Sequence, residues 1–194
     1  MTYDPTTLPA NLPVPEDDGA ADHLEGTAFP SVRLETTSGE LDLAEIATGL
    51  LVLYVYPRTG RPGVEPPPGW DETPGARGCT PQSCGYRDHG AELRELGATV
   101  VGLSAQSIDD QREATERLSL SHTVAADPEL RLAEALGLPT FEFDGRRLYK
   151  RLALVAERGR IVKVFYPVFP PDENAADVAA WLRQRQSMVT TSTG

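Results

Sequence analysis

The chain has 194 residues, with 18 Lys or Arg against 29 Asp or Glu, so its formal net charge at pH 7 is −11. This acidic excess disfavours nucleic acid and anionic membranes as partners. No apolar run reaches the length of about 18 residues that would predict a transmembrane helix. The length is sufficient for one domain with a substantial core and terminal extensions.

The N-terminal segment predicts an arm outside the main domain. Residues 1–25 are expected to be extended and to dock through Leu8, Leu12 and Val14. The segment is rich in Pro, Asp and Glu and lacks the basic and apolar regions of a secretory signal. We therefore expect a cytoplasmic protein, in which a stable structural disulfide is disfavoured but a cycling one is plausible.

The first half of the main domain predicts a hairpin followed by alternating strands and helices. Polar and apolar residues alternate on both sides of Ser38-Gly39, which indicates paired strands over 32–35 and 40–43. The continuous apolar run 51–56 is typical of a buried central strand. Further elements are expected as a helix over 84–96, a buried strand over 98–103, a helix over 109–118 with Ser107 as its N-cap, and a short strand over 122–125.

The second half predicts one more helix, a second hairpin and a terminal helix. Asp127-Pro128 is expected to begin a helix that Gly137 ends. The remaining predictions are strands over 148–156 and 160–166, a helix over 172–185, and a disordered tail over 186–194. This order indicates an α/β fold with a mixed central sheet flanked by helices, and functional sites at the carboxyl ends of its strands.

The two cysteines of the chain, Cys79 and Cys84, lie together in the segment Gly-Cys-Thr-Pro-Gln-Ser-Cys-Gly-Tyr-Arg-Asp, residues 78–88. The segment follows the 51–56 strand and a Pro/Gly-rich stretch, an order that places Cys79 at a helix N-terminus. Unpaired backbone N–H groups and the positive end of the helix dipole favour a thiolate there. The pattern predicts redox chemistry at a thiol.

The spacing of the two thiols does not suit a static disulfide. On one regular helix their Cα atoms would be about 8 to 9 Å apart, whereas a disulfide needs roughly 4.4 to 6.8 Å. The pair can therefore bond only if the helix unwinds, as in a catalytic cycle. Two unrelated buried thiols would meet at this junction only by coincidence. A metal site is disfavoured because two thiolates fill half of a tetrahedral shell, and His89 and His122 lack ligand spacing.

Segment 78–88 resembles the Gly-Cys-Thr-x-x-x-Cys-Gly-Phe-Arg-Asp motif of the peroxiredoxins, in the bacterioferritin-comigratory or Q-type branch. Tyr56-Pro57 resembles the strand end before the active loop, and 150–155 the strand with the active-site arginine. Segment 26–30 resembles the segment that precedes the first hairpin. The similarity covers about residues 25–185, so it implies a thioredoxin-like domain over 26–185.

The chain departs from the family motif Pro-x-x-x-Thr-x-x-Cys. An insertion of 21 residues, 58–78, with five prolines and five glycines, separates Pro57 from Cys79. Thr59 is the favoured candidate for the motif's hydroxyl, and Thr73 is the alternative. A loop of this length is expected to shape access to the site or a partner surface, with Trp70 as its anchor.

The resemblance implies a mechanism without a cofactor or metal. Cys79 would be the peroxidatic thiol that attacks a peroxide and becomes a sulfenic acid. Arg151 would stabilise the thiolate and the transition state. Cys84 would be the resolving thiol, and a thioredoxin-like dithiol would reduce the resulting disulfide. The resemblance leaves a monomer and a homodimer open.

Two other functions fit the same residues. One is a thiol–disulfide oxidoreductase, for which Leu138-Pro139-Thr140 resembles the cis-proline context of thioredoxin-like proteins, although the Cys-x4-Cys spacing argues against it. The other is a non-catalytic redox sensor, in which a disulfide changes a partner surface.

Overall fold

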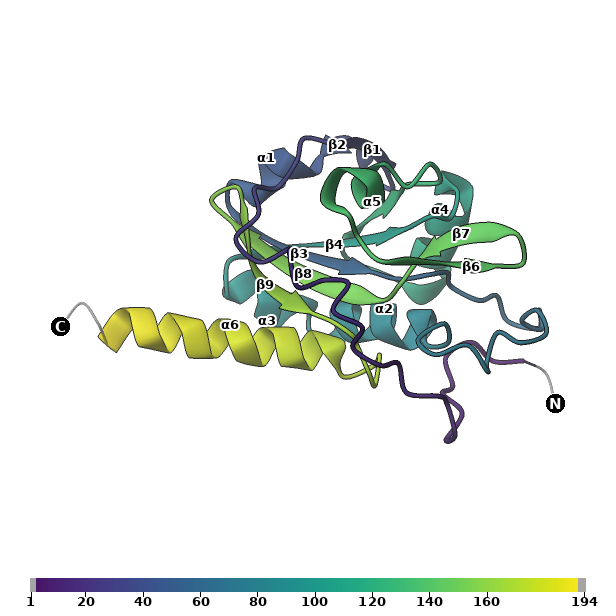
Figure 1. Ribbon diagram of the computed structural model, residues 1–194. Coiled ribbons are helices and arrows are strands. Elements are labelled where there is room, and N and C mark those ends of the chain that lie inside the picture. The colour runs from purple at the N-terminus through teal and green to yellow at the C-terminus, as the bar shows by residue number, and fades with distance from the viewer. Residues whose placement is uncertain (1–2, 192–194) are drawn as a thin grey trace.

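The computed structural model describes residues 3–191, and a seven-stranded mixed sheet forms its centre (Figure 1). The strand order is β2-β1-β5-β4-β3-β8-β9. Strands β3, β4 and β5 are parallel, and the outer pairs are antiparallel. The strands are β1 (Arg33–Thr36), β2 (Gly39–Asp42), β3 (Leu50–Val55), β4 (Ala98–Ser104), β5 (Thr123–Ala126), β8 (Leu152–Glu157) and β9 (Arg160–Phe165).

Helices cover both faces of this sheet, which confirms the predicted α/β fold class. In Figure 1, α2, α3 and α6 lie below the sheet, and α1 and α5 lie above it. The helices are α1 (Leu43–Ala47), α2 (Cys79–Asp88), α3 (Gly90–Glu95), α4 (Ile108–Leu118), α5 (Arg131–Leu136) and α6 (Asn174–Thr191). Within residues 3–191, no helix has both the length and the apolar character needed to cross a membrane.

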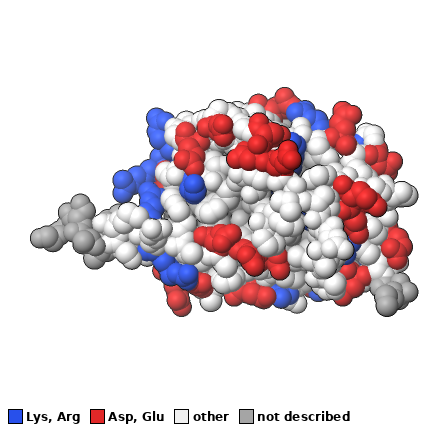
Figure 2. All heavy atoms as spheres, turned by 60° about the horizontal axis from the view of Figure 1, so that its bottom comes forward, with Lys and Arg blue, Asp and Glu red and all other residues white. Residues whose placement is uncertain are grey.

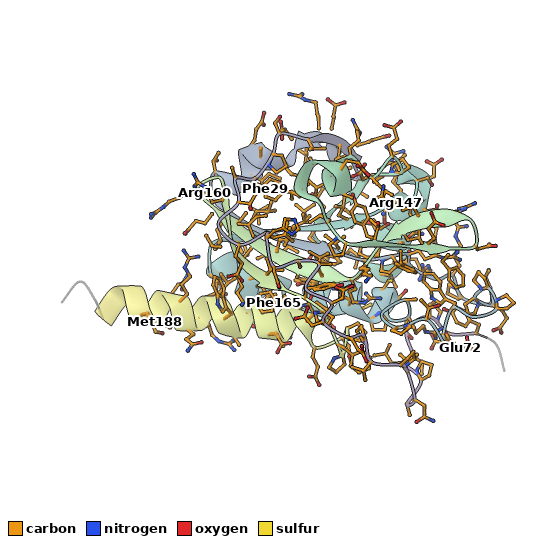
Figure 3. All side chains as sticks on the ribbon, viewed as in Figure 1. Phe29, Glu72, Arg147, Arg160, Phe165 and Met188 are labelled. Atoms are coloured by element: carbon orange, nitrogen blue, oxygen red, sulfur yellow. The ribbon has the colours of Figure 1, made fainter. Side chains whose placement is uncertain are left out.

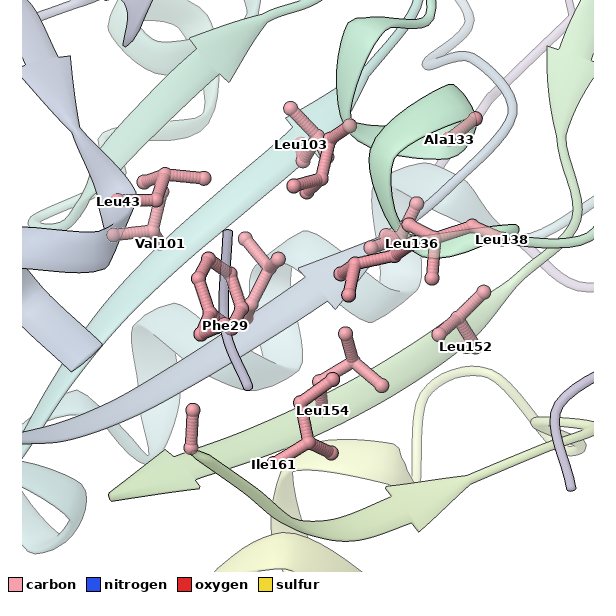
Figure 4. Close-up of a cluster of buried hydrophobic side chains, with 14 of the residues drawn as sticks. Phe29, Leu43, Val101, Leu103, Ala133, Leu136, Leu138, Leu152, Leu154 and Ile161 are labelled. Atoms are coloured by element: carbon pink, nitrogen blue, oxygen red, sulfur yellow. The ribbon is translucent and has the colours of Figure 1, made fainter. Parts of the chain in front are cut away.

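The continuous apolar run of β3 faces two hydrophobic clusters at once. Leu51, Leu53 and Val55 point into the cluster under α1 and α5, which Figure 4 shows. Val52 and Tyr54, between them, point into the cluster under α2, α3 and α6. Side chains of a strand alternate between its faces, so a strand covered on both sides is apolar at every position.

The helix predicted over 84–96 is instead two helices, and the first of them begins five residues earlier. The helix α2 starts at Cys79, and His89 ends it and leads into α3 with non-helical backbone angles. The predicted position of Cys79 at a helix N-terminus is confirmed. The helix periodicity indicated a helix only from Cys84, because Thr80 and Pro81 are weak helix formers. Proline is nevertheless well tolerated in a first turn, where its missing N–H would have no acceptor.

The helix expected from Asp127 begins only at Arg131. Leu130 has φ of +55°, which interrupts a helix at this position. The Asp127 carboxylate instead accepts hydrogen bonds from the backbone N–H groups of Arg131 and Leu132, both at 2.9 Å. The predicted end is confirmed, since Gly137 caps α5 in the left-handed region.

A hairpin that the sequence analysis missed stands apart from the main sheet. Strands β6 (Thr140–Phe143) and β7 (Arg146–Tyr149) pair across a two-residue turn, in which Asp144 and Gly145 have φ of +50° and +68°. Such Asp-Gly turns are typical of tight hairpins. The strand expected over 148–156 is therefore divided between β7 and β8.

Two further expectations at the chain ends need correction. Val14 is 63% exposed and does not dock the arm, whereas Leu8 and Leu12 are half-buried. The last helix continues to Thr191 rather than ending near Arg185, and the Gln186 side chain donates a hydrogen bond to the Leu96 carbonyl. The rest of the predicted tail, 192–194, lies outside the described residues.

Candidate active site

Cys79 is the first residue of α2 and lies beyond the carboxyl end of β3. Cys79 is only 2% exposed. Gly78 before it has φ of +104°, and a Cβ there would lie 2.3 Å from the Pro171 ring, so only glycine fits. The first N–H groups of a helix have no acceptor within it, and α2 therefore directs free donors to the region of this thiol.

Arg151 is the cation at this thiol. It lies between β7 and β8, is 3% exposed, and its Nη2 is 3.1 Å from the Cys79 Sγ. The same nitrogen is 3.0 to 3.2 Å from the carbonyl oxygens of Gly75, Ala76 and Arg77. The turn before Cys79 therefore holds the guanidinium beside the sulfur, the position that the role predicted for Arg151 requires.

A buried polar chain that was not predicted from the sequence extends this arrangement. Arg151 Nη1 donates to Gln82 Oε1 at 2.5 Å, and Gln82 Nε2 donates to Asn174 Oδ1 at 3.0 Å. The Tyr86 hydroxyl donates to the same Asn174 oxygen at 2.8 Å. Gln82 follows Cys79 by three residues, on the same side of α2, and this i,i+3 spacing was the only signal for it.

Cys84 lies on the same helix, and neither cysteine is in a disulfide. Its side chain is half-buried, and burial is the main cause that raises the pKa of this thiol. Arg87 pairs with Asp88 at 2.8 Å and also donates to the Leu118 carbonyl. That pair is a structural contact within the molecule.

A cavity of about 820 Å³ opens beside Cys79. Thr59 lines it and is 6% exposed, with its Oγ1 3.1 Å from Gln106 Oε1. Thr73 lies on a separate pocket and donates to the Gly69 carbonyl. Pro57 is buried at the end of β3. The structure thus brings Thr59, but not Thr73, to the cavity of the reactive thiol.

Residues 24–181 match the Redoxin family model. The chain belongs to the Redoxin family. Among curated proteins, this redoxin is 26% identical over 162 residues to the putative peroxiredoxin bcp of Coxiella burnetii, covering 81% of this chain and 97% of the relative. It is also 26% identical over 164 residues to the chloroplastic peroxiredoxin Q of Suaeda salsa, covering 82% of this chain and 67% of the relative. These matches confirm the predicted resemblance to Q-type peroxiredoxins.

Solved structures show that the redoxin shares the expected fold. It superimposes on the peroxidoxin BcpB of Mycobacterium tuberculosis with a TM-score of 0.66 at 23% identity, covering 84% of this chain and 98% of the other. It also superimposes on a cysteine mutant of PrxQ from Xylella fastidiosa with a TM-score of 0.68 at 18% identity, and the match covers 84% of this chain and 98% of the other. The thioredoxin-like peroxiredoxin fold is therefore confirmed.

The insertion of this redoxin is anchored by Trp70, as predicted. Trp70 is 4% exposed and meets the Phe143 ring edge-on at a centroid distance of 5.0 Å. The centroid of the Phe141 ring lies 6.4 Å from that of Trp70. Both phenylalanines belong to β6, so the missed hairpin and the insertion form one wall of the cavity.

The N-terminal arm of the redoxin reaches the same site. Arg77, two residues before Cys79, donates from Nη2 to the carbonyl oxygens of Asp4 and Thr7 at 3.1 and 2.9 Å. Its guanidinium lies 4.6 Å from the centroid of the Tyr3 ring. Tyr3 and Pro5 line the cavity. The arm therefore contacts the residues directly before the reactive thiol.

One support for the disulfide-exchange alternative is absent. Within the described residues, the cis peptide bonds precede Pro167 and Pro170. The bond before Pro139 is not among them, so the expected cis-proline context is wrong at this position.

Proposed function

We propose that this redoxin is a thiol-dependent peroxidase that reduces hydrogen peroxide or organic hydroperoxides at Cys79. The observation that supports this most is the Arg151 guanidinium, 3.1 Å from a sulfur at a helix N-terminus beside an open cavity. Both the cation and the free N–H groups can stabilise negative charge on the thiolate and on the departing peroxide oxygen.

In the first step, the Cys79 thiolate attacks one oxygen of the peroxide. A sulfur–oxygen bond forms as the oxygen–oxygen bond breaks, the second oxygen takes a proton, and water or an alcohol leaves. The sulfur is thereby oxidised to a sulfenic acid. Arg151 holds the sulfur, and Thr59 would offer its hydroxyl oxygen to the proton of the bound hydroperoxide. Pro57 would fix the end of β3 against this loop.

In the second step, Cys84 would resolve the sulfenic acid. Its sulfur would attack the Cys79 sulfur, form the disulfide and release water. Both residues lie on the regular helix α2, which keeps their Cα atoms about 8 to 9 Å apart, so α2 must unwind first. Unwinding would also expose Cys84 to water and remove the burial that raises its pKa.

Recycling would use an external dithiol of the thioredoxin type. Its thiolate attacks the Cys79–Cys84 disulfide and leaves with both cysteines reduced and its own pair oxidised. We place this cycle in the cytoplasm, in a monomer or a homodimer.

Stopped-flow oxidation and steady-state turnover with a thioredoxin system test the two roles separately. Cys79→Ser should abolish rapid reaction with peroxide. Cys84→Ser should keep the first, rapid oxidation but lose recycling, and its mass should rise by one oxygen. Normal recycling by Cys84→Ser would contradict the resolving role. Oxidation of the wild-type protein no faster than an ordinary thiol would leave disulfide exchange or redox sensing as its function.

A further inference from the structure

The cavity beside Cys79 is much larger than hydrogen peroxide requires. Its volume of about 820 Å³ is within the range of roughly 300 to 1,000 Å³ that is usual for sites of drug-sized ligands. Three segments far apart in the sequence line it together with residues that follow β4 and β5, namely the arm, the insertion 58–78 and the β6–β7 hairpin. Figure 1 shows the insertion and the hairpin side by side at the end of the sheet where the arm begins.

One wall of this cavity is apolar and aromatic. Trp70, Phe143 and Leu148 line it together, and Leu148 is 7% exposed. The edge-on contact of Trp70 with Phe143 holds both rings in place. Such a wall can contact an apolar substrate body, whereas hydrogen peroxide offers nothing to fill it.

The cavity is cationic although the whole chain is acidic. Five arginines line it, against two aspartates. Arg61 pairs with Asp110, Arg77 with Asp71, and Arg147 with Glu134. The other two, Arg58 and Arg146, have no carboxylate within 4 Å among the described residues. Figure 3 shows Arg147 on the hairpin and Glu72 on the insertion at this end of the molecule.

Arg58 is the better placed of these two cations. It is half-buried, next to Thr59, and its guanidinium carbon lies 5.2 Å from the centroid of the Trp70 ring. A guanidinium that stacks through its face keeps its N–H groups free at the edge, where they can bind a carboxylate in a bidentate manner. Arg146 is exposed at the rim, on β7.

We infer that the preferred substrate is an organic hydroperoxide with an apolar body and a carboxylate. Arg58 binds the carboxylate, and Trp70, Phe143 and Leu148 contact the body, while the hydroperoxide group reaches Cys79. This inference rests on the peroxidase function proposed above. It assigns to the insertion, which separates this chain from the family motif, a role in substrate choice.

The first test compares cumyl hydroperoxide bearing a para-carboxylate with its methyl ester, by stopped-flow oxidation of the reduced protein. We expect the carboxylate to react about tenfold faster, the equivalent of one charge-assisted hydrogen bond. In Arg58→Gln this ratio should fall to about one, and salt should lower it in the wild type. Arg33→Gln, on the distant strand β1, should keep the wild-type ratio.

A second test separates the inferred site from the chemistry. The two cumyl alcohols that the reaction would release are titrated into a Cys79→Ser/Trp181→Phe variant, in which Trp70 is the remaining tryptophan, and its fluorescence is followed. Tighter binding of the carboxylated alcohol, lost in Arg58→Gln, supports the site even if peroxide reduction were to fail. Equal binding of both alcohols overturns it.

The outcomes distinguish the two proposals. Rapid oxidation by hydrogen peroxide with equal rates for carboxylate and ester overturns the inference and leaves the peroxidase function intact. A ratio that collapses in Arg146→Gln but not in Arg58→Gln overturns the assignment to Arg58. Slow oxidation by every peroxide contradicts the proposed function, and the alcohol titration then decides the site alone.

Discussion

Arg151 illustrates how much of the site depends on the shape of one side chain. Its guanidinium contacts the Cys79 sulfur, the Gln82 amide and three carbonyl oxygens at once. A lysine ammonium is a single point with three donors and cannot span these partners. We expect Arg151→Lys to lower the rate of Cys79 oxidation by hydrogen peroxide about a hundredfold, as measured by stopped flow.

The matched control is Arg158→Lys, at the exposed turn between β8 and β9. It should oxidise at the wild-type rate. If Arg151→Lys also did so with its fold intact, the charge of residue 151 alone would be sufficient, and the fork geometry would be irrelevant.

The buried side chain of His122 is expected to make the stability of the fold depend on pH. Its Nε2 lies 2.7 Å from the Tyr54 hydroxyl, and burial lowers its pKa from 6.5 to about 4. Between these values the unfolded chain binds a proton at His122 and the folded chain does not, so stability is full above pH 6.5 and falls as the pH falls toward 4. The loss amounts to about 3 kcal/mol.

Urea unfolding at pH 7 and pH 4.5 measures this difference. His122→Gln retains a partner for Tyr54 but does not titrate, so its loss of stability between the two pH values should be smaller than that of the wild type. Equal losses in both proteins would show that other groups cause the pH dependence.

At the scale of elements, Asn174 links the start of α6 to α2 by hydrogen bonds, in addition to the apolar packing between the two helices. Asn174 is 2% exposed and accepts from both Gln82 and Tyr86 of α2. We expect Asn174→Leu to lower the free energy of unfolding by about 3 kcal/mol, because two buried donors lose their acceptor. Hydrogen exchange should become faster in α2. Asn174→Asp keeps an acceptor oxygen and should lose less.

The elements differ in how far the sequence reveals them. The strands β3 and β4 were predicted within one residue, because burial on both faces leaves an unbroken apolar run. The β6–β7 hairpin was missed although β6 alternates in polarity, because β7 does not alternate and its apolar end was assigned to the strand expected over 148–156. Cys79, Cys84 and Arg151 could be proposed from motif resemblance, whereas Gln82 and Asn174 meet only in three dimensions, 92 positions apart.

At the scale of the whole molecule, the surroundings of the thiol could not be predicted. The insertion pointed to a loop near the site, but nothing in the sequence indicated that the arm and the hairpin would join it. The positions of Arg58 and Arg77 in the cavity depend on contacts with residues that the sequence did not place near them. The net charge likewise hid the cationic cavity, because the acidic residues that outnumber the basic ones are scattered over the surface, as Figure 2 shows for one face of the molecule.

The hydrogen bonds between the N-terminal arm and Arg77 should protect the chain from cleavage by trypsin after Arg77. Arg77 is 7% exposed, and both its side chain and its carbonyl are held in the reduced protein, the carbonyl by Arg151. Because α2 must unwind before Cys79 and Cys84 can bond, we expect the closed disulfide to displace this segment. Trypsin should therefore cut after Arg77 much faster in the oxidised protein than in the reduced one, as peptide mass mapping would show. A Cys84→Ser protein treated with peroxide should resist, and equal cutting in both redox states would mean that the arm stays in place throughout the cycle.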